Sequence, residues 1–93
     1  MTWSVFERKA AKKALDKAPQ EIREKWTLWL EIVRHSGPRA LRDIPGFHDE
    51  ALKGQWAGHR ASRLNIRYRV IYEVDETTRC VIVEDVTRHD YAK

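Results

Sequence analysis

A stripe of large apolar side chains between residues 20 and 35 is the strongest folding signal in the chain. The apolar residues recur there at intervals of 4, 3, 1 and 3, at Ile22, Trp26, Trp29, Leu30 and Val33. This spacing places them on one side of an α-helix, so it predicts an amphipathic helix over 20–35. Such a helix has to bury its apolar side against another element of structure.

A shorter helical pattern precedes this stripe, and β-like runs follow it. Residues 7–17 carry alanines and Leu15 on one side and lysines on the other, which predicts a first helix. Segments rich in β-branched and aromatic residues are typical of strands; they are 2–6, 50–54 continuing into 59–65, 67–74 and 80–87. The pattern predicts an α+β fold of order β-α-α-β-β-β, with two N-terminal helices packed on one face of a small twisted antiparallel sheet.

Length and cysteine content restrict the class of protein. The 93 residues suit one domain with one modest core, so residues 1–93 are expected to form a single domain. No apolar run is long enough to span a bilayer, and no secretory signal is expected at the N-terminus. The one cysteine, Cys80, allows no internal disulfide, which fits a reducing cytoplasmic setting.

Positive charge is concentrated in the middle of the chain. Residues 51–72 contain five Lys or Arg and no carboxylate, whereas residues 73–93 contain three and six. Four of the five cations are arginines, and all four lie within residues 59–69. Guanidinium groups bind phosphate oxygens in pairs and stack on bases. The block therefore favours a phosphate-rich partner over a merely solubilising surface.

Strand parity predicts which arginine lies on the uncovered side of the sheet. In 67–74 the tyrosines and valines point one way, so Arg69 points the other way, onto the face that the helices leave open. Arg60 and Arg63 have opposite parities, so one of them at most shares that face in the middle of its strand. Such a face would bind extended single-stranded RNA. The alternative for Arg69 is a cross-strand ion pair with Glu73 or Glu84.

Five segments in the second half of the chain form a specific combination. They are EALKG at 50–54, GHR at 58–60, RLN at 63–65, YRVIY at 68–72 and HDY at 89–91. The combination resembles the RelE/ParE superfamily of toxins from type II toxin–antitoxin systems, and within it the RelE/YoeB-like branch of mRNA interferases. The resemblance covers nearly the whole chain and implies a RelE-like fold.

The resemblance also implies an activity. Toxins of this branch enter the ribosomal A site and cut mRNA there, which inhibits translation. The ribose 2′-oxygen attacks its own 3′-phosphate, so the resemblance implies an endoribonuclease that needs no metal and no cofactor. Such a reaction needs a base, positive charge on the phosphorane and an acid for the leaving 5′-oxygen.

Residue roles follow from position in the matched motifs. The resemblance implies Glu50 as the base, Arg69 and Arg63 as the groups that stabilise the phosphate, His89 as the acid, and Tyr91 as the group that stacks on a base or positions the 2′-hydroxyl. Asp90 separates His89 from Tyr91 where YoeB-like proteins have the two adjacent, so the acid stays open among these three. Lys53, Arg60 and Arg67 are expected to contact RNA.

The remaining histidines are expected to bind no metal. His35, His48 and His59 stand singly, and no pair has the spacing of zinc ligands. The sequence therefore predicts no metal site.

The resemblance implies partners and leaves two other functions open. The expected partners are a cognate antitoxin, the ribosome and mRNA, without a membrane; the chain is expected to be a monomer when free and part of a heteromer with the antitoxin. One alternative is a ParE-like toxin that inhibits DNA gyrase by binding. The other is a relative that binds RNA without cutting it.

Overall fold

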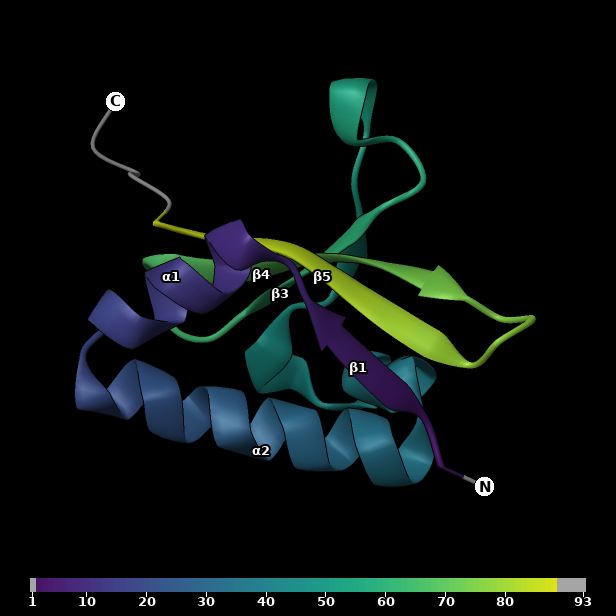
Figure 1. Ribbon diagram of the computed structural model, residues 1–93, viewed down its shortest axis with the longest axis horizontal. Helices are drawn as coiled ribbons and strands as arrows, with labels where there is room; N and C mark the ends of the chain where they lie inside the picture. The colour runs from purple at the N-terminus through teal and green to yellow at the C-terminus, as the bar shows by residue number, and fades with distance from the viewer. Residues whose placement is uncertain (1, 89–93) are drawn as a thin grey trace.

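The computed structural model describes residues 2–88, which form two α-helices and a five-stranded mixed sheet with the strand order β1-β5-β4-β3-β2 (Figure 1). The helices are α1 (Lys9–Lys17) and α2 (Gln20–Ser36), and the strands are β1 (Ser4–Glu7), β2 (Glu50–Ala51), β3 (Arg60–Arg63), β4 (Tyr68–Asp75) and β5 (Cys80–Arg88). Three short 3-10 helices, η1 (Pro38–Asp43), η2 (Pro45–Phe47) and η3 (Gly54–Trp56), lie in the connections. The predicted α+β fold is confirmed.

Both helices cover the same face of the sheet. Four residues of the apolar stripe of α2 are buried as predicted, and the fifth, Leu30, is partly buried against the same core. The rings of Trp26 and Trp29 stack with their centroids 4.9 Å apart. Ala11 and Leu15 of α1 join the same core, which continues into β4 and β5. Gly37 ends α2 with φ of 85°, and a Cβ there would lie 2.8 Å from Nε1 of Trp3, so the packing of Trp3 requires glycine.

The first strand does not pair as predicted. The expectation of an antiparallel sheet is right for β2 to β5, but β1 runs parallel to β5, with Val5 opposite Val81. Short turns join β3, β4 and β5 in antiparallel order, which leaves the outer edge of β5 for β1. The chain passes from β1 directly into α1, which packs against β5, and this connection sets the direction of β1.

The expected strand from residue 50 to residue 65 is interrupted. Only Glu50 and Ala51 form β2, and the chain then leaves the sheet and returns at Arg60. The intervening segment projects from the body of the molecule with η3 at its tip (Figure 1). Gly54 and Gly58 have φ values of 67° and 90°, which L side chains rarely adopt, so the glycines permit this excursion.

Strand parity in β4 is confirmed. Val70 and Tyr72 are buried in the core under the helices, with Tyr68 and Val74 packed against its margin. Arg69, Ile71 and Glu73 consequently lie on the opposite face. We call this second face, which α1 and α2 do not cover, the open face.

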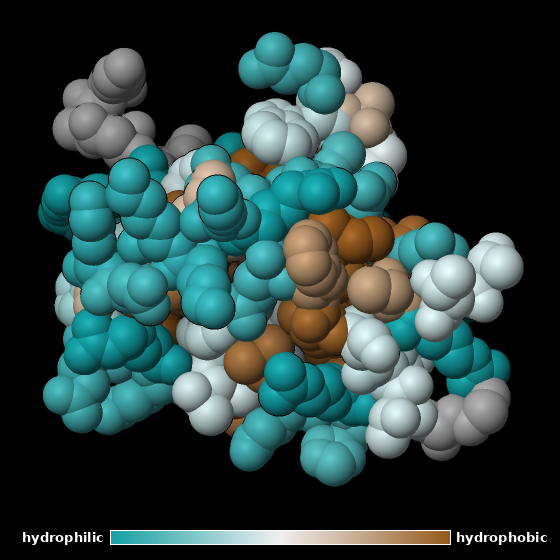
Figure 2. Space-filling model, in the orientation of Figure 1, coloured by the Kyte–Doolittle hydropathy of each residue, from teal (hydrophilic) through white to brown (hydrophobic). Residues whose placement is uncertain are grey.

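Figure 2 shows the molecule from the side of α1 and β1. Polar side chains cover the helices, and an apolar patch lies over β1 and the neighbouring part of β5. Phe6 of β1 is 54% exposed, and β1 is an edge strand of the sheet. Among residues 2–88, no helix combines the length and the apolar character needed to cross a membrane.

Candidate functional site

The register of the sheet brings predicted site residues onto the open face. Arg63 of β3 lies directly opposite Arg69 of β4, and directly paired residues of an antiparallel sheet share a face. Glu50 of β2 lies opposite Ala61, which lies opposite Ile71. Glu50, Arg63 and Arg69 are therefore on one surface that extends over three adjacent strands.

Arg69 is half-buried on this face, and its side chain makes no ion pair or hydrogen bond within the part of the chain that the structure describes. Its Nε is buried without an acceptor there. The alternative ion pair with Glu73 or Glu84 does not form, because both carboxylates lie beside His59 instead. Arginines at directly paired positions place two positive charges on neighbouring strands of this face, and a phosphate bound between them would reduce their repulsion.

Glu50 is exposed on β2, and the residue before it is a buried anchor. The carboxylate of Asp49 is 0% exposed and accepts hydrogen bonds from Arg60 Nε at 2.7 Å, from Ser62 Oγ at 2.7 Å and from the hydroxyl of Tyr72. Ser62 Oγ in turn accepts a hydrogen bond from Trp29 Nε1 at 3.0 Å. We call these five residues the Asp49 network. The network ties the start of β2 to β3, β4 and α2, so it holds the backbone that presents Glu50.

Two titrating groups of the Asp49 network have shifted pKa values. Burial, and then the hydrogen bond to Asp49 and its charge, raise the pKa of Tyr72 well above its ordinary value. Burial lowers the pKa of Arg60, but the hydrogen bond and charge of Asp49 outweigh that effect and raise it overall. Tyr72 therefore stays protonated as a donor, and Arg60 stays charged.

The predicted RNA contacts lie in different places. Arg60 faces the helix-covered side, opposite Tyr72, where it binds Asp49, so the geometry favours a structural role for it. Arg67 is exposed in the turn before β4, and Lys53 is exposed at the base of the projecting segment. Of the two arginines of β3, Arg63 is the one that shares the face of Arg69.

The predicted tail residues His89 and Tyr91, with Asp90 between them, lie outside the described residues. The last described residue of β5, Arg88, lies opposite Tyr68, and Thr87 lies opposite Arg69. The described part of β5 therefore ends beside Arg69, which together with Arg63 we call the arginine pair.

Among residues 2–88, one group of side chains on the open face could hold a metal ion, and the sequence spacing did not indicate it. His59, Glu73 and Glu84 place one ligand atom each within 4.8 Å of one another. The three come from different strands or strand ends, so no local motif reveals them. The Asp49 network was missed for the same reason, because Asp49 reads as an ordinary loop carboxylate next to Glu50.

The solved structures with this fold include toxin–antitoxin complexes. The chain is similar to the RelE–RelB complex from Pyrococcus horikoshii OT3, with a TM-score of 0.78, 23% identity, and 99% of this chain and 100% of that chain covered. For the DinJ–YafQ complex from E. coli the TM-score is 0.75 and the identity 15%, with coverage of 96% and 94%. For the YoeB–YefM complex from Staphylococcus aureus the TM-score is 0.73 and the identity 19%, with 97% of this chain and 100% of that chain covered.

No protein-family model and no curated protein matches the sequence. At identities of 23% and below, the structural likeness shows the fold, and the predicted RelE-like fold is confirmed.

Proposed function

We propose that this chain, which has the fold of the RelE, YoeB and YafQ toxins, is the toxin of a toxin–antitoxin pair and cuts mRNA in the ribosomal A site. The observation that carries the proposal is the cross-strand pair of Arg63 and Arg69 on the open face, with Glu50 on the same face. The likeness over nearly the full length of solved toxins supports the toxin role.

The proposed reaction is an internal transfer of the phosphodiester. Glu50 accepts the proton of a ribose 2′-hydroxyl, and the 2′-oxygen attacks the adjacent phosphorus. The bond from phosphorus to the 5′-oxygen of the next nucleotide breaks, which leaves a 2′,3′-cyclic phosphate and a 5′-hydroxyl. An acid from the tail, His89, Asp90 or Tyr91, gives the leaving oxygen its proton.

The arginine pair stabilises the transition state in this proposal. Negative charge grows on the nonbridging oxygens of the phosphorane, and the guanidinium groups of Arg69 and Arg63 donate hydrogen bonds to those oxygens. Because the pair sits on adjacent strands, its spacing is set by the sheet and not by a loop. Lys53 and Arg67, both exposed, would contact the RNA backbone on either side. Arg60 contributes through Asp49 to the position of β2.

The proposed partner is an antitoxin that covers part of this surface. Several solved structures with this fold are toxin–antitoxin complexes. The exposed Phe6 on edge strand β1 adds an apolar contact point of the kind found at protein interfaces. We place the protein in the cytoplasm, because its proposed target is the translating ribosome. We also propose that the protein is a monomer when free.

The test compares two arginines in cells. The unchanged chain, Arg69→Ala and the control Arg42→Ala, which alters an exposed arginine of η1, are induced separately, and mRNA 5′ ends are mapped. We expect growth arrest with new 5′ ends in translated messages for the unchanged chain and the control, and neither for Arg69→Ala. Growth arrest with intact messages, together with loss of supercoiling by purified gyrase, would replace this proposal with the ParE-like alternative.

A further inference from the structure

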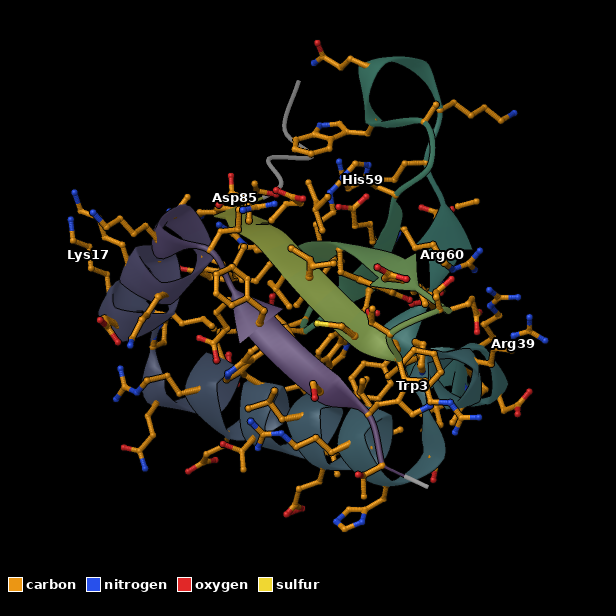
Figure 3. The ribbon with its side chains drawn as sticks, turned by 45° about the vertical axis from the view of Figure 1, so that its right-hand side comes forward. Trp3, Lys17, Arg39, His59, Arg60 and Asp85 are labelled. Carbon is orange, nitrogen blue, oxygen red and sulfur yellow. The ribbon has the colours of Figure 1, made fainter. Side chains whose placement is uncertain are left out.

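Three side chains from neighbouring strands converge at the end of the open face away from the arginine pair. His59 lies one residue before β3, Glu73 is on β4 and Glu84 is on β5. His59 Nε2 is 3.6 Å from an oxygen of Glu84 and 3.9 Å from an oxygen of Glu73. Figure 3 shows His59 below the projecting segment between β2 and β3.

A β-bulge places Glu84 in this group. Tyr72 pairs with Val83 and Ile71 pairs with Asp85, so Glu84 is the extra residue of β5. Bulges re-aim side chains and occur often beside functional sites. The bulge is the one register shift in the pairing of β4 with β5.

The distances leave a gap of the size that a metal ion fills. At 3.6 and 3.9 Å, the imidazole donates a hydrogen bond to neither carboxylate. Zinc bonds of about 2.0–2.2 Å in tetrahedral geometry hold donor atoms roughly 3.4 Å apart, so the three donors, which lie within 4.8 Å of one another, would move closer together to bind one ion. His59 Nδ1 is buried without a partner in the described chain, so Nε2 is the nitrogen that an ion can reach.

The charges also favour a cation. Arg8 Nε donates to Oε1 of Glu84 at 2.9 Å, which leaves Oε2 directed toward His59. With a neutral imidazole, two carboxylates and one guanidinium leave a net charge of −1. The side chains of His59, Glu73 and Glu84 are 19%, 40% and 19% exposed, so this charge is partly shielded from water but still open to an ion.

We infer that His59, Glu73 and Glu84 form a binding site for a divalent transition-metal ion, with zinc as the best match to one imidazole and two carboxylates. The ion would connect the start of β3 to β4 and β5 on the open face. The site is separate from the arginine pair, and the inference stands independently of the proposed function. It differs from the expectation that His59 binds no metal.

Titration of the chelator-treated chain with zinc sulfate, followed by calorimetry, tests the site. We expect one ion per chain, and saturation should raise the melting temperature by about 5 °C or more. His59→Asn and Glu73→Gln should each weaken binding at least roughly tenfold. Glu73 is the more exposed of the ligands, so its variant keeps the test valid if His59→Asn does not fold.

Matched controls separate this site from adventitious zinc binding. Glu76→Gln alters an exposed carboxylate of the turn after β4 and should bind zinc as the unchanged chain does. A variant with Asn in place of His35, His48 and His89 should also keep the affinity; Asn suits His48, whose φ is 43°. Loss of binding in this triple variant, or unchanged affinity in Glu73→Gln, would overturn the inference.

Discussion

Two carboxylate clusters on opposite faces of the same sheet differ in how well their polar atoms are satisfied. In the Asp49 network, one carboxylate with no exposed surface receives three hydrogen bonds. Around His59, two carboxylates lie 3.6 and 3.9 Å from an imidazole that donates to neither. A satisfied buried network holds structure, whereas a group with spare donors and acceptors is suited to a ligand.

The same contrast separates two arginines of neighbouring strands. Arg60 is bound to the buried Asp49 on the helix-covered face, and Arg69 lies without an ion pair in residues 2–88 on the open face. By composition both belong to the same basic block of the sequence. The ion pair with Asp49 indicates that Arg60 stabilises the fold, whereas the side chain of Arg69 has no such partner and suits the proposed phosphate contact.

The largest expected effect comes from removing the buried carboxylate of Asp49. Asp49→Ala leaves the buried side of Arg60 and the hydroxyls of Ser62 and Tyr72 without their acceptor, so the free energy of unfolding should fall by about 3–5 kcal/mol. Glu84→Ala, on the open face, should cost about 1 kcal/mol or less, since its ion pair with Arg8 is partly exposed. Urea denaturation measures both. Equal losses in the two variants would contradict the contrast between the clusters.

Next comes the comparison of the two arginines. Arg69→Ala should lower RNA cleavage by about 10²–10³-fold, as for removal of a donor to a transition-state oxyanion, with little change in stability. Arg60→Ala should mainly destabilise, because it leaves Asp49 buried with an unpaired charge. Cleavage on translating ribosomes and urea denaturation of the same preparations measure the two effects. A stable Arg60→Ala that has lost cleavage would show that Arg60 acts on RNA after all.

A smaller effect tests the link between the Asp49 network and α2. Ser62 is fully buried and connects Trp29 to Asp49. Ser62→Ala leaves the indole N–H of Trp29 without an acceptor and should reduce stability by about 1–3 kcal/mol. Thr27→Ala is the control, since its hydroxyl bonds the backbone of its own helix in an exposed position. A loss no larger than that of the control would show that the hydrogen bond from Trp29 adds nothing.

Features that depend on local periodicity were predictable. The stripe from Ile22 to Val33 specified α2 and its buried side, because the helical repeat is a property of neighbouring residues. The alternation in β4 likewise placed Arg69 on the open face. Together these two predictions placed Arg69 on the face that the helices leave open, without any knowledge of strand order.

Features that depend on register between distant strands were not predictable. The parallel pairing of β1 with β5, the choice of Arg63 over Arg60 and the burial of Asp49 all follow from which strand edges meet. The group around His59 also needs the bulge at Glu84, which shifts the pairing by one residue. Nothing in the spacing of 59, 73 and 84 indicates that these positions are neighbours.

The smallest effect concerns pH and distinguishes Tyr72 from an ordinary tyrosine. Burial and the hydrogen bond to Asp49 raise the pKa of Tyr72, so the folded chain keeps this proton at a pH where the unfolded chain, with a tyrosine pKa of about 10, releases it. The stability that Tyr72 contributes is therefore complete below about pH 10 and is lost as the pH rises further. Each pH unit in that range should remove up to about 1.4 kcal/mol.

Tyr72→Phe isolates this contribution, because every other residue is the same in both chains. The variant should be less stable near neutral pH, having lost the hydrogen bond to Asp49, but its free energy of unfolding should fall less steeply above about pH 10. Guanidinium denaturation of both chains between about pH 8 and pH 11 measures the two slopes. Equal slopes of the free energy of unfolding against pH would mean that the phenol of Tyr72 reaches water in the folded chain. The Asp49 network would then be as open to solvent as the group around His59.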